Sequence, residues 1–119
     1  MKSLGDEYEE RAATLVENSG LRLLARNFRG RTGEIDIVAE DGERLVFIEV
    51  RARSNRYFNS AAGSVDRRKQ QRIIRTAQIF LQCRPQWATA PCRFDVIAFE
   101  PPQSGSQPKI RWIRGAFTA

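Results

Sequence analysis

The stretch GEIDIVAEDGERLVFIEVRAR, residues 33–53, decides the fold. Apolar residues alternate along 34–40 and again along 44–53, and this period of two is typical of β-strands. The Asp-Gly pair between them predicts a tight hairpin turn. Each strand also carries an acid among apolar neighbours, Asp36 in the first and Glu49 in the second. Ionised carboxylates are costly away from water unless they are paired or bound to a metal, so this hairpin is also a candidate functional site.

The chain on either side of the hairpin alternates between helical and strand patterns. We predict helices at 6–19 and 65–84, and strands at 21–28, 34–40, 44–53, 92–100 and 109–117. The order of helix, three strands, helix and two strands predicts an α/β fold with a mixed central sheet flanked by helices. We expect a single domain over residues 1–119, with its core at about 5–100 and an edge strand at about 109–117.

Composition fits a globular cytoplasmic protein. Apolar residues make up 41% of the 119, and no apolar run approaches the about 20 residues that a membrane-spanning helix needs. The N-terminus turns acidic at once and lacks the apolar segment of a secretory signal. Cys83 and Cys92 do not form a disulfide framework, and we expect two buried free thiols. We therefore expect no membrane partner and a cytoplasmic location.

Charge and the absence of histidine limit the chemistry. Without histidine the chain lacks the commonest general base, the usual zinc site and any Ser-His-Asp or Cys-His mechanism. The net charge of +6 comes from 20 Lys and Arg against 14 Asp and Glu. Such basicity fits a polyanion partner, since neutralising phosphates drives nucleic-acid binding. An arginine-rich genome would produce the same bias, and composition leaves both explanations open.

The two strand acids and the base that follows them suggest phosphodiester hydrolysis. Asp36 and Glu49, from neighbouring strands, would offer hard oxygen ligands to Mg²⁺ or Mn²⁺. The metal would lower the pKa of a bound water and neutralise charge on the phosphate. Arg51, on the same strand face as Glu49, would hold the water or the scissile phosphate. Glu9 borders the apolar face of the first helix and could add a third carboxylate. The alternative is that the acids form ion pairs with nearby arginines.

Basic residues gather in the turn after the first strand, at the end of the third strand and on the second helix. We expect DNA contacts from Arg29, Arg31, Arg53, Arg67, Arg68 and Arg72. Tyr57 and Phe58, in a loop expected at 54–64, could contact the DNA backbone or bases. Alternatively, the helix cations form a solvated stripe. Asp95, beside Arg93, is expected to form a structural salt bridge.

Several motifs occur in an order that matches a known family. The matching segments are Gly5-x-x-x-Glu9-x-x-Ala12, Ala25-Arg26-Asn27-Phe28-Arg29, Gly33-Glu34-Ile35-Asp36, Phe47-Ile48-Glu49-Val50-Arg51-x-Arg53, Val65-x-x-x-Lys69, Ala77 and Arg93-Phe94-Asp95-Val96. Together they resemble the YraN-like family of small bacterial proteins. Members are predicted endonucleases similar to archaeal Holliday-junction resolvases, within the PD-(D/E)xK nuclease superfamily. The resemblance covers residues 5–100.

This resemblance implies a restriction-endonuclease-like core and metal-binding roles for Glu9, Asp36 and Glu49. It also implies structured or branched DNA as substrate, and a homodimer, because resolvase-like enzymes usually act as dimers. The catalytic lysine of the superfamily falls on Arg51. Arginine stays protonated and cannot serve as a general base, although Lys69 could supply an amine from the second helix. Three functions stay open: a metal-dependent endonuclease, a non-catalytic DNA-binding module with a degenerate site, or, with less support, an interaction protein whose last strand pairs with a partner's edge strand.

Overall fold

The computed structural model describes residues 3–52, 65–100 and 107–119. Arg53, Tyr57, Phe58 and the expected 54–64 loop lie outside the described residues. The elements in chain order are α1 (Leu4–Asn18), β1 (Arg22–Gly30), β2 (Gly33–Asp41), β3 (Arg44–Ala52), α2 (Arg67–Gln82), a short 3-10 turn η2 (Pro85–Trp87), β4 (Cys92–Glu100) and β5 (Lys109–Phe117). The predicted element order is confirmed.

Local capping explains where the helices begin. At the start of α1, Ser3 accepts a hydrogen bond from the Asp6 backbone N–H, and the Asp6 side chain accepts one from Ser3 in return. At the start of α2, the Asp66 side chain accepts a 2.8 Å hydrogen bond from the Lys69 backbone N–H. Both caps satisfy backbone donors that a helix leaves unpaired at its first turn. The Asp66 cap therefore fixes α2 to begin two residues later than expected.

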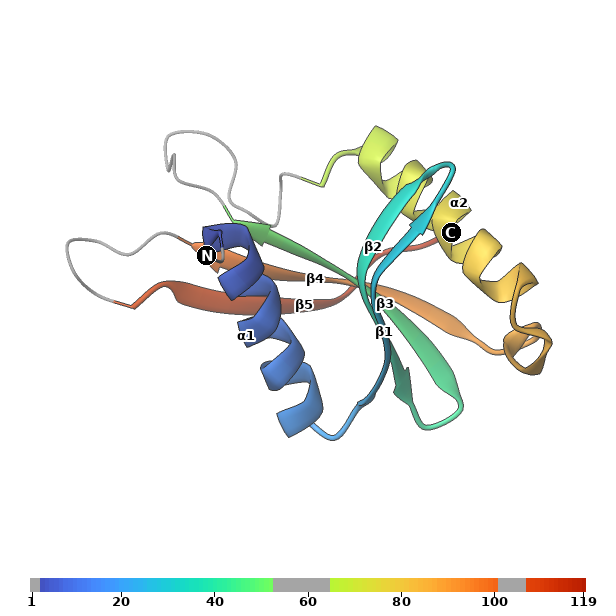
Figure 1. Cartoon of the computed structure of the whole chain (residues 1–119), viewed down its shortest axis with the longest axis horizontal. Helices are drawn as coiled ribbons and strands as arrows, with labels where there is room; N and C mark the ends of the chain where they lie inside the picture. The colour runs from blue at the N-terminus through green and yellow to red at the C-terminus, as the bar shows by residue number, and fades with distance from the viewer. Residues whose placement is uncertain (1–2, 53–64, 101–106) are drawn as a thin grey trace.

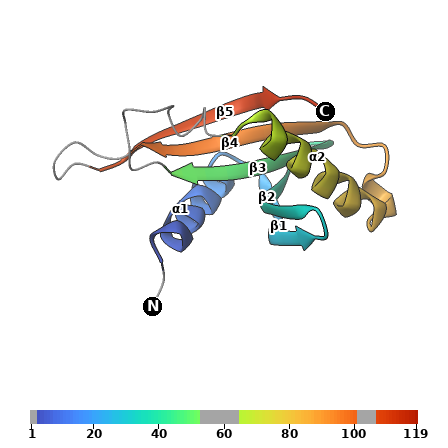
Figure 2. The ribbon, with the colours of Figure 1, turned by 90° about the horizontal axis from the view of Figure 1, so that it is seen from above.

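The strands form one five-stranded sheet in the order β1-β2-β3-β4-β5 (Figure 2). All neighbours are antiparallel except β3 and β4, which are parallel. The mixed sheet and the edge position of β5 are both confirmed. The hairpin from β2 to β3 closes through the pair Asp41↔Arg44, and Gly42 has the positive φ of 64° that so short a turn requires.

Each face of the sheet carries its own apolar cluster. Val46 and Ile48 of β3 pack with α1, whereas Phe47 of the same strand packs with α2. Figure 1 shows the β1–β2 hairpin standing between the two helices. The expected alternation fails at one point, because Ile35 packs in the α2 cluster and Ile37 in the α1 cluster. This change of side coincides with the end of the β2–β3 ladder at Ile37↔Ile48.

Helix α2 is positioned by its contacts with the β1–β2 hairpin. The hydroxyl of Thr76, which is fully buried on α2, lies 2.8 Å from that of Thr32 in the hairpin turn. A Cβ at Gly30 would stand 3.3 Å from the Ile79 side chain, so the close approach of hairpin and helix favours glycine. These contacts hold the second half of α2 against the β1–β2 hairpin.

Two further observations concern the whole described chain. Cys83 and Cys92 are free thiols, as expected, but both are exposed, so the expectation of buried thiols is wrong. Each lies at the end of an element, where the chain leaves the core. In residues 3–52, 65–100 and 107–119, no helix has the length and apolar character needed to cross a membrane.

Candidate active site

The candidate site lies at a fork between β2 and β3. The ladder of these strands ends at Ile37↔Ile48, and the next residue on each strand is an acid, Asp36 or Glu49. Here the Asp36 carboxylate accepts a 2.8 Å hydrogen bond from the Val50 backbone N–H. The side chain thereby replaces the backbone acceptor that β2 no longer offers to β3. The hairpin thus brings Asp36 beside Glu49, which the sequence allowed but did not fix, because it left the register of the two strands open.

Lys69 of α2 completes this group of charged side chains. Its Nζ lies 3.0 Å from Oε2 of Glu49, whose side chain is 5% exposed. The contact is an ion pair by distance, yet that oxygen is buried without a donor in hydrogen-bonding geometry. Burying a carboxylate oxygen without such a donor is costly. Glu49 therefore contacts the Lys69 ammonium group and the Asp36 carboxyl group, and it retains capacity to bind another cation or donor.

The carboxyl group of Asp36 holds its proton more tightly than an ordinary carboxyl group does. The pKa of Asp36 is raised from 3.8 to about 8, first by burial and then by the hydrogen bond with Glu49 and the charge of Glu49. The Val50 N–H and the Lys69 charge act in the opposite direction. Two carboxylates this close cannot both ionise readily, so near neutral pH a proton occupies the fork. A divalent cation could take the place of that proton.

Glu9 lies near this pair, on α1. Burial raises its pKa first, followed by the negative charges of Asp36 and Glu34. With its amide nitrogen facing the two glutamates, Asn27 donates to Glu9 at 2.7 Å and to Glu34 at 2.9 Å. Among the described residues, no three Asp, Glu, Cys or His side chains lie close enough together to hold one metal ion. The structure therefore pairs Asp36 with Glu49, and the three-carboxylate ligand set stays a prediction.

Asn27 is a residue that the sequence reasoning missed as part of the site. It lies inside β1 with a φ of 53°, a left-handed conformation that asparagine tolerates better than most residues. An asparagine between Arg26 and Phe28 in a predicted strand was the available signal. Its amide links Glu9 on α1 to Glu34 on β2, and so helps to fix the carboxylate of α1 relative to the sheet.

Arg51, the residue expected at the catalytic lysine position, lies on β3 opposite Ala98 of β4 and is half-buried. Lys69 is the cation that the structure places on Glu49. The amine at the carboxylate pair thus comes from α2, as the alternative route in the sequence suggested. Whether either residue acts in catalysis stays a prediction.

The arginines expected to contact DNA lie mainly on exposed surfaces. Arg67, Arg68 and Arg72 are exposed on α2, and Arg31 is exposed in the β1–β2 turn. The side chain of Arg29 is 79% exposed and lies 3.4 Å from Glu34. The α2 segment carries five Lys and Arg and no Asp or Glu in its 16 residues. A helix of one charge sign attracts polyanions, but DNA binding itself stays a prediction.

Asp95 on β4 forms the expected structural ion pair, and its environment is more complete than expected. Arg93 donates to both carboxylate oxygens, at 2.9 and 3.1 Å. The Trp112 indole N–H and the Gly115 backbone N–H, both on β5, donate at 2.8 and 2.9 Å. The side chain is fully buried. Asp95 therefore joins the edge strand β5 to β4.

Comparison with known proteins relates the chain to a family described only as the uncharacterised protein family UPF0102, whose profile matches residues 8–99. A UPF0102 protein of Stutzerimonas stutzeri is 47% identical over 116 residues, covering 98% of this chain and 95% of the relative. A UPF0102 protein of Pseudomonas entomophila is 45% identical, covering 95% of this chain and 91% of the relative. A third, of Pseudomonas fluorescens, is 43% identical with the same coverage.

Proposed function

The chain belongs to the uncharacterised protein family UPF0102, and for this member we propose the function of a metal-dependent endonuclease that hydrolyses phosphodiester bonds in DNA. The observation that carries the proposal is the under-satisfied carboxylate pair at the fork of the sheet. Asp36 has a raised pKa of about 8, and Glu49 has a buried oxygen without a hydrogen-bond donor. Perturbed acids of this kind are a mark of functional sites.

The residues at the fork fit Mg²⁺ or Mn²⁺. Carboxylate oxygens are the donors that these hard cations prefer, and the chain has no histidine to favour zinc. Asp36 and Glu49 would hold the ion, with Glu9 as the proposed third ligand. When bound, the ion would supply a water of lowered pKa and would neutralise charge on the phosphate.

The remaining roles fall to cations around the pair. Lys69 Nζ, 3.0 Å from Glu49, would hold the attacking water or a phosphate oxygen beside the carboxylates. Arg51, two residues after Glu49 on β3, would hold the scissile phosphate. The exposed arginines of α2 and of the β1–β2 turn would bind the flanking backbone. This division places the amine on α2 and the guanidinium on β3.

The order of the helices and strands also supports the proposal. The order α1-β1-β2-β3-α2-β4 is the order expected of a restriction-endonuclease-like core, and the parallel pair β3–β4 follows the crossover through α2. By its resemblance to resolvases we propose structured or branched DNA as substrate and a homodimer as the active form.

A cleavage assay tests this proposal. Duplex, flap and four-way-junction DNAs would be incubated with the wild type, Asp36→Asn, Glu49→Gln and the control Glu43→Gln, which removes an exposed carboxylate from the same hairpin. We expect cleavage only with Mg²⁺ or Mn²⁺, and a loss of at least about a hundredfold in both site variants. Cleavage that survives in both site variants, with both folded, would show that the site is wrong.

A second candidate is a DNA-binding module without catalysis. The density of cations on α2 favours it, because that surface can bind DNA whatever the fork does. In this case DNA binding would weaken steeply with salt and would be indifferent to divalent metal. Absence of cleavage from the whole panel, together with metal-independent binding, would favour this candidate over the nuclease.

A further inference from the structure

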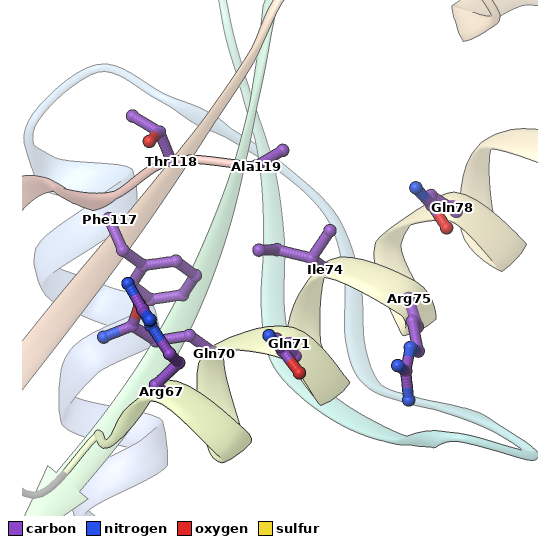
Figure 3. A pocket seen from close by; sticks show the side chains of 9 residues that line it. All are labelled: Arg67, Gln70, Gln71, Ile74, Arg75, Gln78, Phe117, Thr118 and Ala119. Atoms are coloured by element: carbon purple, nitrogen blue, oxygen red, sulfur yellow. The ribbon is translucent and has the colours of Figure 1, made fainter.

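A groove of about 630 Å³ lies between the outer side of α2 and the end of β5 (Figure 3). Arg67, Gln71 and Ile74 line it from the helix, and Phe117 lines it from the strand. In Figure 3 the Arg67 side chain lies beside the Phe117 ring at one end, and Gln78 lies towards the other. The volume falls within the range of ligand sites in proteins, about 300–1,000 Å³.

The charge of the groove selects an anionic ligand. Two of its lining residues are the exposed arginines Arg67 and Arg75, and none of its described lining residues is an Asp or Glu. The two arginines lie eight residues apart on α2, about 12 Å along the helix axis. Guanidinium groups bind phosphate in a bidentate way. Two such groups along one groove suit a ligand with repeated phosphates.

The other side chains suit nucleobases. Gln71 and Gln78 each present an amide that can donate to and accept from a base edge. Phe117 stacks on Phe94 with ring centroids 5.1 Å apart, which fixes the plane of its ring at the groove. An aromatic ring beside a basic groove is the arrangement by which proteins bind unpaired strands. A base still inside a duplex could not enter a hollow between a helix and a strand.

We propose that this groove binds an unpaired DNA strand, with phosphates on Arg67 and Arg75 and bases against Gln71, Gln78 and Phe117. The inference rests on the proposed function and narrows its substrate to DNA with an unpaired strand beside the duplex. Arg67 and Gln70 flank Lys69 in the first turn of α2, and Lys69 contacts Glu49. A strand in the groove therefore passes close to the candidate active site, around the start of one helix.

Fluorescence anisotropy in EDTA tests the groove separately from cleavage. The probes are a labelled single strand of 20 nucleotides, the blunt duplex of the same sequence, and that duplex with a single-stranded overhang. The variant Arg67→Gln/Arg75→Gln is compared with Arg22→Gln/Arg44→Gln, which removes two exposed arginines outside the groove. A second variant, Gln71→Ala/Gln78→Ala, changes only exposed amides and keeps the charge.

We expect the groove arginine variant to bind the single strand and the overhang roughly tenfold more weakly, and to lose clearly less affinity for the blunt duplex, to which the exposed arginines of α2 also contribute. The dependence of log affinity on log salt should become shallower by about 0.7 for each lost phosphate contact. The glutamine variant should weaken single-strand binding and keep the wild-type salt dependence. The control arginine variant should match the wild type on the single strand.

Three results would overturn the inference: equal weakening on single strand and duplex, wild-type strand binding by both groove variants, or competition by polyglutamate as effective as that by the single strand. The last would identify the groove as a general polyanion surface. Because the titrations contain no metal, they do not depend on cleavage. If the wild type cleaves no DNA but the groove variants bind the single strand more weakly, the nuclease proposal fails and this inference holds. If the wild type cleaves DNA but the groove variants bind the single strand as the wild type does, only this inference fails.

Discussion

Two sites in the same sheet contain buried acidic side chains, but they differ in how far the protein satisfies the hydrogen-bonding capacity of those carboxyl groups. Asp95, between β4 and β5, receives four hydrogen bonds from an arginine, an indole and a backbone N–H. The pair of Asp36 and Glu49, at the β2–β3 fork, has a backbone hydrogen bond from Val50 and a hydrogen bond between its own two carboxyl groups. The Lys69 ammonium group contacts Oε2 of Glu49 without forming a hydrogen bond to it. Both sites lie among apolar residues of central strands.

The difference separates a structural acid from a functional one. A buried carboxylate whose oxygens are all satisfied by the protein gains nothing from an added cation. A pair that must retain a proton near neutral pH is under-satisfied, and a cation can replace the proton. The number of donors around an acid therefore says more about its role than its burial does. Substitutions at Asp95, Asp36 and Lys69 test this difference between the two sites.

The largest effect is expected at the structural acid. Asp95→Asn leaves the half-buried Arg93 guanidinium with only its longer contact to Asp41, and should lower the free energy of unfolding by about 3–5 kcal/mol. Chemical denaturation would measure it. Asp41→Asn is the control, because Asp41 is exposed and lies 3.8 Å from the same guanidinium, so its loss should cost under about 1 kcal/mol. Equal losses of stability in the two variants would contradict the conclusion that Asp95 is a structural acid.

The second-largest effect is expected in how the free energy of unfolding depends on pH. The folded-state pKa of Asp36 lies above its ordinary value, so the stability that its proton contributes is complete below about pH 4 and is lost as the pH rises towards 8. Without metal, the wild type should lose roughly 3 kcal/mol more than Asp36→Asn between pH 5 and pH 8.

Denaturation at a series of pH values in EDTA provides this comparison. The control Glu43→Gln, which alters an exposed acid in the same hairpin, should keep the wild-type slope. A wild-type curve as flat as that of Asp36→Asn would mean that the fork holds no proton at neutral pH, and the distinction from Asp95 would fail.

The smallest effect is expected at Lys69. Its side chain is 35% exposed, so solvent screens much of the contact with Glu49. Lys69→Gln should lower the free energy of unfolding by about 1 kcal/mol in EDTA, whereas the neighbouring exposed Arg68→Gln should change it by less than about 0.5 kcal/mol. A loss as large as that of Asp95→Asn would show that Glu49 depends on Lys69 alone, as a structural ion pair does.

The local periodicities of the sequence predicted most of the fold. The two-residue period and the Asp-Gly turn predicted neighbouring strands that carry Asp36 and Glu49, but they left the register of the strands open. Helical spacing located both helices. The side change at Ile35 was not predictable, because it arises where β2 leaves β3. Two of the hydrogen-bond donors to Asp95 could not be predicted from the sequence either. Trp112 and Gly115 are 17 and 20 residues away, and they contact Asp95 only because β4 pairs with β5.

The candidate site was partly predictable for the same reason. The two acids lie on strands that the local periodicity predicted, and Lys69 was recognised as a source of an amine. The angle at which α1 crosses the sheet decides how near Glu9 comes to Asp36, and no local pattern encodes that angle. Asn27, whose amide reaches Glu9, depends on a left-handed backbone position within a strand.

Calorimetric titration with Mn²⁺ near pH 7.5 tests most directly whether the fork is a cation site. The wild type should bind the ion saturably, and the heat should vary with the ionisation enthalpy of the buffer, because binding releases about one proton from the carboxyl pair. Asp36→Asn and Glu49→Gln should give no saturable heat, and Glu43→Gln should match the wild type. Absence of saturable heat in the wild type, or wild-type binding by both site variants, would contradict the account.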